Sequence, residues 1–375
     1  MVQFYIGNLL DGRGIQILPD VLKGSWSETL NAAGALQCTV PLTDPTILRM
    51  RLMESATPGK SFLAAVQGDT VLQAGPIWEH EYHETSDGNQ LTLFAGGMWS
   101  YFDHRLLLPV LAGRLPTDPT TDTNLVKSLQ GIARYYVWQA QQETNGNVPV
   151  ILPDEIAGTN ERNEAGSSLA FVGPRLRELT AVENGPDIKF APRFNTARDG
   201  FEWVMQIGTP TQPLIYGAIE PTFTLGLKES SISNLKVRNV GAGLGSRAFV
   251  AGGKISGEML IAAATDTSLT TAGYPVLDIA DRSHASVSET ATLQSYADGA
   301  VLSGKRPEIT ISFDHQVSKQ PYIAGFNVGD FGNVKVPFPH PYLQQKTYRS
   351  RLVSRSGDEV TDKVSLMFQP EVVSG

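Results

Sequence analysis

A run of glutamate and histidine side chains at residues 79–84 comes closer to a metal site than any other part of the sequence. It reads EHEYHE, and imidazole and carboxylate groups are both ligands for zinc. The surrounding residues predict a strand, on which side chains three positions apart, such as His80 and His83, point to opposite faces. We therefore predict no metal here and interpret the run as an exposed rim or a contact between subunits.

Two glycine-containing runs resemble phosphate-binding loops without meeting their requirements. Pro58 to Ser61 reads PGKS, but a phosphate-binding loop needs a glycine where this chain has Glu54. Such a loop also follows a strand and precedes a helix, whereas this run follows a predicted helix and precedes a predicted strand. Gly241 to Gly245 reads GAGLG, which is one residue short of the dinucleotide fingerprint and lacks a clear following helix. We interpret both runs as turns.

The single cysteine and the other histidines offer no nucleophilic pair. Cys38 shares one face of a strand-like run with Leu36 and Val40, so we predict a buried thiol rather than a reactive one. No spacing in the sequence joins the other histidines to a serine, cysteine or carboxylate in the manner of a catalytic triad. These histidines are His104, His284, His315 and His340.

Five tryptophans could offer flat surfaces to a sugar, but each falls in a predicted strand or helix, where packing in the core is commoner. A glycosidase needs two carboxylates that can come from anywhere in the chain, so the sequence does not exclude one. We predict no catalytic, cofactor-binding or metal-binding residues and no cofactor. The tryptophans are Trp26, Trp78, Trp99, Trp138 and Trp203.

The composition is that of a globular protein with a sizeable core. Of 375 residues, 41% are hydrophobic and 18% are charged, and this length suggests about two to four domains. We expect no signal peptide and no membrane span, because no basic region with a following apolar run opens the chain and no long apolar run occurs. One cysteine allows no internal disulfide, which fits assembly in a reducing cytoplasm.

The net charge of −8 argues against a surface that holds nucleic acid through many phosphate contacts. Such a surface needs clustered lysine and arginine. An acidic wall repels phosphate, so the charge is compatible with DNA that passes the protein without adhering to it.

The elements that must position these residues are clearest between Ser61 and His104. Turns at residues 68–69 and 86–89 fold several strand-like runs back on one another, and a helical turn closes the stretch. The runs are Phe62–Val66, Thr70–Ala74, Ile77–Glu84 and Gln90–Phe94, and the helical turn is Met98–His104.

The residues before this stretch predict a hairpin, a half-buried strand and a helix. Asp44 can cap a helix, and Pro45 fits its first turn, so we expect a helix from there to about Ser55. The predicted strands are Val2–Asn8 and Ile15–Leu18 in the hairpin and Gly34–Val40 after it.

From Leu106 to about Glu220 the pattern is mixed. A linker rich in proline, threonine and aspartate at residues 109–123 precedes a helix that we expect Asn124 to cap, with an apolar stripe as far as Ala140. A second helix is predicted at Pro174–Glu183. The predicted strands are Ile188–Phe194, Phe201–Ile207 and Leu214–Ile219.

Strand patterns return from Thr222 and are interrupted once, at about residues 254–305. The interruption contains a helix at Ser288–Leu302, with Ser286 and Glu289 at the spacing of a capping box. The simplest interpretation is a second β domain with an insertion. Its predicted strands are Thr222–Leu227, Leu235–Val240, Ser246–Ala251, Glu308–Phe313, Tyr322–Asn327, Asn333–Val336, Tyr348–Ser354 and Lys363–Phe368.

This order of elements resembles the hub proteins of phage tails, above all the minor tail proteins of long non-contractile tails of actinobacterial phages and, more distantly, the baseplate hub of contractile tails. The stretches that carry it are Trp26–Leu42, Phe62–Trp99, Leu176–Phe190 and Asn234–Gly253. The resemblance implies an α+β, mainly β fold with two tail-tube-like antiparallel β-barrel domains. The implied domains are 1–105 (first barrel), 106–220 (α+β), 221–253 with 306–375 (second, discontinuous barrel) and 254–305 (small helix-containing insertion).

The resemblance further implies a structural protein without enzymatic activity, located in the virion at the tail tip and assembled in the host cytoplasm. Three copies would form a pseudo-six-fold ring between the hexameric tail tube or distal tail protein and the fibre or spike proteins. The ring would let the tape measure protein and the genome pass, with DNA present in transit alone and no stable membrane association. Two alternatives stay open: a tail-associated cell-wall hydrolase, and a receptor- or carbohydrate-binding tail protein.

Overall fold

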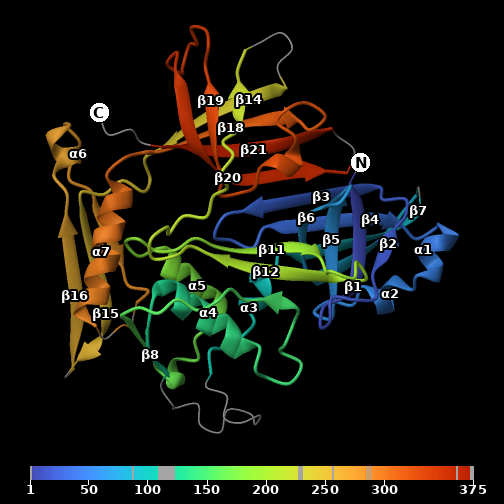
Figure 1. The fold of residues 1–375 in the computed structure, drawn as a ribbon, viewed down its shortest axis with the longest axis horizontal. Helices are drawn as coiled ribbons and strands as arrows, with labels where there is room; N and C mark the ends of the chain where they lie inside the picture. The colour runs from blue at the N-terminus through green and yellow to red at the C-terminus, as the bar shows by residue number, and fades with distance from the viewer. Residues whose placement is uncertain are drawn as a thin grey trace.

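A computed structural model describes residues 2–86, 88–108, 123–226, 231–255, 257–284, 287, 289–359 and 362–371. Strands dominate the fold, and a group of helices lies at the lower centre of the view, while a small β-sheet with its own helices stands to one side (Figure 1). The chain is therefore mainly β with some helices, as the sequence predicts. The linker expected at residues 109–123 lies outside the described residues except for Thr123.

A single large sheet contains 13 strands of the described chain, in the order β14-β18-β21-β20-β3-β4-β7-β6-β5-β1-β2, with β19 also paired with β20 and β13 paired with β19. Its strands from the first part of the chain are β1 (Gln3–Asn8), β2 (Gln16–Leu18), β3 (Lys23–Thr29), β4 (Ala35–Pro41), β5 (Ser61–Gln67), β6 (Thr70–Thr85) and β7 (Gly88–Gly96). Those from the last part are β13 (Thr222–Thr224), β14 (Ile232–Val240), β18 (Glu308–Gln316), β19 (Phe331–Lys335), β20 (Thr347–Asp358) and β21 (Lys363–Pro370).

The expectation of two separate closed barrels is not met by the described strand pairs. The ladder is continuous from β14 to β2, because the last residues of β20 in one half pair with β3 of the other half in antiparallel fashion. The backbone groups that could have closed each half on itself are thus used to join the halves. The sheet is antiparallel apart from the pairing of β13 with β19.

Most of the strands in the first part lie where the sequence predicts them. The two expected runs Thr70–Ala74 and Ile77–Glu84 form one strand, β6, of 16 residues. The chain stays paired through Gly75 and Pro76, which lie opposite Leu63 and Phe62 of β5. The missing Cβ of Gly75 lets the backbone pass close to Gly96, since a Cβ there would lie 2.1 Å from the Gly96 carbonyl oxygen.

The helix expected from Pro45 to Ser55 is divided into two short helices. Asp44 caps the first by accepting hydrogen bonds from the backbone N–H groups of Thr46 and Ile47, as predicted. Arg51 then adopts the left-handed conformation with φ of 46°, which ends one helix and begins the other. The helices are α1 (Pro45–Arg49), α2 (Leu52–Ser55) and, after β7, α3 (Trp99–Phe102).

The middle part combines helices with two small sheets. The prediction that Asn124 caps a helix is wrong: residues 123–127 form a strand in which Thr123 and Leu125 are buried, and Ser128 caps the helix through the N–H of Gly131. The elements are β8 (Thr123–Lys127), α4 (Leu129–Ala140), β9 (Val150–Ile151), β10 (Asn160–Glu164), a 3-10 helix (Gly166–Ser168), α5 (Val172–Thr180), β11 (Ile188–Phe194) and β12 (Phe201–Ile207).

A separate three-stranded sheet with a helix on one face forms the small part beside the middle part (Figure 1). The strand predicted at Ser246–Ala251 belongs to this sheet and not to the large one, because β15 pairs with β16 and β17. Glu289 precedes the helix without a side-chain cap, and Ser286 and Ser288 lie outside the described residues. The elements are β15 (Arg247–Ile255), β16 (Glu258–Thr265), α6 (Ser268–Thr271), β17 (Asp278–Asp281) and α7 (Thr290–Gly304).

Two predicted strands do not form. In the stretch Leu214–Ile219 the N–H of Ile215 donates to Asp187 and the N–H of Gly217 donates to Asp330, so carboxylates take the place of a neighbouring strand. In the stretch Tyr322–Asn327 the chain makes a 3-10 turn, Ile323–Gly325, before β19. In the second stretch Ile323 and Phe326 are buried, whereas in the first Leu214, Tyr216 and Ile219 are exposed.

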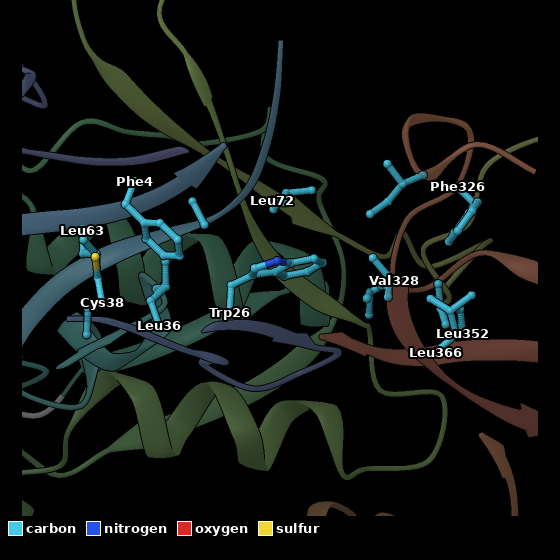
Figure 2. Close-up of a cluster of buried hydrophobic side chains, with 14 of the residues drawn as sticks. Phe4, Trp26, Leu36, Cys38, Leu63, Leu72, Phe326, Val328, Leu352 and Leu366 are labelled. Atoms are coloured by element: carbon cyan, nitrogen blue, oxygen red, sulfur yellow. The ribbon is translucent and has the colours of Figure 1, made fainter. Parts of the chain in front are cut away.

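One hydrophobic core extends across both halves of the large sheet. Figure 2 shows Trp26 between a group from the first half, with Phe4 and Leu36, and a group from the second half, with Val328 and Leu352. A second core lies between the first half and the helices, where the indole N–H of Trp203 donates to the carbonyl of Ala74 at 2.9 Å. The parts of the chain are therefore packed together and not merely connected.

Candidate assembly site

The glutamate-histidine run lies on an exposed half of β6. Glu79, Glu81, His83 and Glu84 are exposed, and His80 is half-buried. Across the described residues, no group of three or more His, Cys, Asp or Glu side chains is placed to hold a metal ion. After a bulge at residue 78 this half of β6 pairs with β7 alone among the described strands, so its other edge is open.

The two glycine-containing runs form turns, as predicted. Gly59 has φ of 73° and donates its N–H to Ile77. Gly241 to Gly245 connects β14 to a strand, β15, and no helix follows at which a dinucleotide phosphate could bind. Neither turn has the order of elements that a phosphate site needs.

The other side chains considered from the sequence are mostly structural. Cys38 is fully buried, and burial raises the pKa of its thiol. Three tryptophans lie in the cores, whereas Trp78 is partly covered and Trp138 is 39% exposed. His315 is buried against the carbonyl of Pro321, and burial lowers the pKa of its imidazole. The three core tryptophans are Trp26, Trp99 and Trp203.

The junction between the two halves of the sheet is an antiparallel ladder of five opposed residue pairs, from Ser354 opposite Thr29 to Asp358 opposite Ser25. Its polar face carries small side chains, and the hydroxyl groups of Thr29 and Ser354 lie 3.2 Å apart. On its inner face, Trp26 packs against the backbone of Gly357, where a Cβ would lie 3.0 Å from the indole nitrogen. Backbone hydrogen bonding and packing thus join the halves together.

A buried carboxylate reinforces this junction. Glu28 of β3 accepts from the guanidinium of Arg355 in β20 at 2.7 Å and from the ammonium of Lys189 in β11 at 2.6 Å. Burial by itself would raise the pKa of Glu28, but the two cations outweigh it and lower that pKa below its ordinary value. One side chain therefore links the first β part, the second β part and the middle part.

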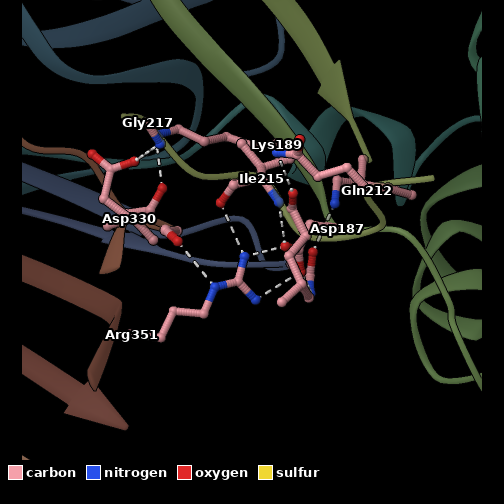
Figure 3. A network of polar contacts seen from close by, with 12 residues as sticks. Asp187, Lys189, Gln212, Ile215, Gly217, Asp330 and Arg351 are labelled. Carbon is pink, nitrogen blue, oxygen red and sulfur yellow. Dashed lines mark hydrogen bonds and ion pairs between the residues drawn. The ribbon is translucent and has the colours of Figure 1, made fainter. Parts of the chain in front are cut away.

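A second buried network lies nearby (Figure 3). Arg351 of β20 pairs with Asp187 and donates to the carbonyls of Gly329 and Ile215, at 2.9 and 3.1 Å. Asp187 also accepts from the amide of Asn31 at 3.1 Å. These contacts fix the connection between the middle part and the second β part, which the sequence suggested would be a strand.

A third group of charges lies where the small part meets the middle part. Glu164 accepts from the phenol of Tyr136 at 2.6 Å and lies 2.9 Å from the guanidinium of Arg175. Burial, the largest effect, raises the pKa of Glu164 although Arg175 opposes it. Next to this group, Arg162 donates to the hydroxyl of Thr292 on α7 at 3.1 Å, beside a cavity of about 270 Å³.

The two halves of the large sheet repeat one strand path. In chain order, strands β3, β4, β5, β6 and β7 are arranged as β3-β4-β7-β6-β5, and strands β14, β18, β19, β20 and β21 are arranged in the same way, with every pair antiparallel. Each half has a bulge at the same point, at residue 78 in β6 and at residue 353 in β20.

The pairing registers allow the two halves to be matched residue by residue. A row of directly opposed residues crosses each half just before the bulge. The rows are Trp26, Leu36, Ala95 and Ile77 in the first half and Val237, Ile311, Phe368 and Leu352 in the second. The chain therefore contains a duplicated β unit, and β20 with β3 is the junction between its two copies.

No protein-family model matches the chain, and no curated protein matches it in sequence. Solved structures match it over nearly its whole length. The tail protein of Neisseria meningitidis MC58 is 11% identical with a TM-score of 0.58, covering 99% of this chain and 96% of that one. The 43 kDa tail protein of prophage MuSo2 from Shewanella oneidensis is 10% identical with a TM-score of 0.60, covering 99% and 98%. The chain has the fold of phage tail proteins.

A third match extends the tail-protein fold to another assembly. The c3393 protein of E. coli, described as a component of the type VI secretion system with structural similarity to the T4 tail proteins gp27 and gp5, is 12% identical with a TM-score of 0.51. The match covers 98% of this chain and 77% of that one. At these identities the likeness concerns the fold alone.

Sequence reasoning found the strands of the tail-protein fold but missed the buried charges that join its parts. Asp187, Asp330 and Glu28 stand in stretches that read as ordinary polar loops and strand ends. No local pattern indicated these partners, because Arg351 and Arg355 stand in a run of mainly polar residues and the bulge at residue 353 places them on opposite faces of β20.

Proposed function

We propose that the protein is the structural hub of a phage tail tip, in which three copies form a pseudo-six-fold ring. The single observation that carries this proposal is the duplicated β unit within the tail-protein fold. A chain with two copies of one unit, joined by β20 and β3, presents six units when three chains associate. Such a ring matches a hexameric partner in symmetry, whereas a ring of three chains with one unit each would not.

The open ends of the sheet support association of copies in a ring. Among the described strands, β14 in the second half of the sheet has one unpaired edge. In the first half, the end of β6 after residue 78 also has one unpaired edge. Exposed strand edges pair with further strands unless they are covered. A heterologous contact that repeats from copy to copy closes into a ring when its rotation permits.

A groove on one face of the second half suggests how the ring could form a conduit. It has a volume of about 720 Å³ and is lined by four serines, four apolar residues, one asparagine, one lysine and one aspartate. Small hydroxyl groups of this kind give DNA no cluster of cations to bind. Because the whole chain carries a net charge of −8, which repels phosphate, the proposed lumen lets the genome and the tape measure protein pass without holding them. The serines are Ser312, Ser354, Ser356 and Ser365.

The remaining partners and the location follow from this role. The ring would lie at the tail tip of the virion, with the tail tube or distal tail protein on one side and fibre or spike proteins on the other. It would act without catalysis. We also propose that the hub works as four units close to the expected divisions 1–105, 106–220, 221–253 with 306–375, and 254–305, with β15 counted in the insertion because it pairs with β16 and β17. No helix in the described part is both long and apolar enough to cross a membrane.

Two measurements test the proposal. Light scattering of the purified protein is expected to give a species of three times the chain mass of 40.6 kDa, and electron cryomicroscopy is expected to place its density as a ring at the tail tip of assembled particles. Density elsewhere in the particle, or a closed assembly of another stoichiometry at the tip, contradicts the proposal. A continuous lysine- and arginine-rich lumen in that map contradicts the proposed conduit.

A further inference from the structure

The internal junction has counterparts at the open edges of the sheet. In the duplicated unit, β6 corresponds to β20 and β14 corresponds to β3, by the matched rows of residues described above. Within the chain, β20 of one unit pairs with β3 of the other. The equivalent edges of β6 and β14 have no such partner among the described strands. They correspond to the two edges that pair at the internal junction.

We propose that β6 of one copy pairs with β14 of the next, in the register of the internal junction, so that Glu81 lies opposite Arg238. This inference rests on the proposed ring and identifies the surface that forms it. The partner is a second copy of this chain. Residues 79–83 of β6 and 236–240 of β14 form the contact.

The register follows from the internal junction without further assumption. Ser356 lies opposite Ser27 in that junction. Ser356 is four residues after Leu352, as Glu81 is four residues after Ile77, and Ser27 follows Trp26 as Arg238 follows Val237. Transfer of the register therefore places Glu81 opposite Arg238.

The charges of the two edges are complementary in this register. Within the contact, Glu79 and Glu81 are exposed on β6, whereas Lys236 and Arg238 are exposed on β14. Glu81 and Arg238 take part in no ion pair with any described residue. Opposed unlike charges on neighbouring strands attract each other. The proposed pairing would give Glu81 and Arg238 a partner of opposite charge.

The apolar side chains of the opposite face also match. Gly357 and Trp26 are opposed at the internal junction, and their equivalents are Tyr82 and Val237. Tyr82 is 52% exposed, which is unusual for a large aromatic side chain on a strand. At the internal junction the larger side chain, Trp26, belongs to β3 and faces a glycine of β20. In the proposed contact the larger side chain, Tyr82, belongs to β6, the equivalent of β20, and faces the smaller Val237 of β14. The volume between the strands is filled in both cases.

Disulfide cross-linking tests the register. We expect Glu81→Cys combined with Arg238→Cys in one chain to give covalent oligomers on mild oxidation, because opposed residues of antiparallel strands lie within disulfide distance. The native Cys38 is fully buried and gives a low background. The matched control is Tyr82→Cys with Arg238→Cys, whose side chains point to opposite faces and are expected to cross-link at least about tenfold less.

Charge exchange tests the energetics. Glu81→Arg or Arg238→Glu alone is expected to weaken self-association about tenfold, since an attraction becomes a repulsion at each interface. The double variant Glu81→Arg with Arg238→Glu is expected to restore it. Because both residues are exposed, the thermal unfolding midpoint of all three variants should equal that of the wild type under conditions where the chain is monomeric.

The outcomes separate this inference from the proposed function. Ring-sized particles that form without the 81–238 cross-link overturn the strand pairing and leave the hub role standing. A cross-link at 81–238 in open chains, with no closed trimer, supports the pairing and contradicts the ring. Absence of the cross-link at every concentration up to the solubility limit overturns the pairing.

Discussion

At the scale of single residues, buried charges that join distant segments determine how this protein holds together. Glu28 has two cationic partners, Arg355 and Lys189, each from a different part of the chain. A buried ion pair adds little net stability over a well-packed apolar pair, but removal of one member leaves the others charged and unpaired. The effect of a mutation here is therefore large even though the net contribution of the group is small.

We expect Glu28→Gln to lower the free energy of unfolding at neutral pH by about 3–5 kcal/mol, because it leaves two buried cations without a counter-charge. Urea unfolding followed by tryptophan fluorescence measures the change. The control is Glu220→Gln, which removes a carboxylate from the more exposed pair with Arg349 and should cost less than about 1 kcal/mol. Equal losses for the two variants would contradict this account.

The lowered pKa of Glu28 also predicts a pH dependence. Its stabilising contribution is fully present above the ordinary pKa of a glutamate, about 4.3, and is lost as the pH falls through the lowered value in the folded protein. The difference in unfolding free energy between wild type and Glu28→Gln should thus shrink on acidification below about pH 4. A difference that stays constant or grows in acid would show that Glu28 does not titrate in this way.

Cys38 is predicted to be inert in the native state. Its side chain is fully buried, and burial raises the pKa of the thiol, so little reactive thiolate is present at neutral pH. A chromogenic disulfide reagent should label one thiol per chain in urea and react at least about 100-fold more slowly in buffer, at a rate set by opening of the fold. Rapid labelling of the native protein would contradict the burial of Cys38.

At the scale of elements, the start of α4 lies at a different residue in the structure from the one that the sequence pattern predicts. The apolar stripe from Leu125 onward fits a helix as well as a strand over its first residues, because a short apolar run does not specify its period. Pairing with β10 places residues 123–127 in a strand. The helix then begins one residue after Ser128, whose hydroxyl accepts from Gly131 and donates to Ile156.

We expect Ser128→Ala to destabilise the protein by about 1–2 kcal/mol, because the helix loses its cap and the carbonyl of Ile156 loses a donor. Asn124→Ala is the matched control, since Asn124 is exposed and lies four residues before the cap, and it should change stability by less than about 0.5 kcal/mol. Thermal unfolding of both variants decides the question. A larger effect of the Asn124 substitution would restore the helix start expected from the sequence.

At the scale of the whole molecule, the continuous sheet and the shared core make the two halves one cooperative unit. Trp26 of β3 lies between the core side chains of the two halves (Figure 2) and its ring covers Gly357 of β20. The small part has a core of its own, formed around Val250, Leu293 and Ala297. Its opening does not require the large sheet to come apart.

We expect Trp26→Ala to cost about 3–5 kcal/mol, because it leaves a cavity at the junction of the halves. Hydrogen exchange followed by mass spectrometry should show both β3 and β20 losing protection together, whereas β15 and β16 change little. Loss of protection in β3 alone would mean that the two halves unfold separately, in contradiction to the shared core.

The sequence by itself determined the strands, because alternation of apolar and polar residues and the turns between them are local properties. It predicted β11 and β12, the buried Cys38 and the second β part interrupted by an insertion, and the order of these elements indicated the tail-protein fold. It also indicated an exposed rim or subunit contact at residues 79–84, where the proposed copy-to-copy contact lies.

Tertiary structure alone decided which strand edges meet. Whether β20 closes its own half or pairs with β3 depends on contacts between residues more than 300 positions apart in the sequence, and no local pattern contains that information. The same is true of Leu214–Ile219, whose backbone is held by Asp187 and Asp330 instead of by a strand. Residue types set what can be buried and paired; the packing of distant segments determined which of these possibilities the chain adopts.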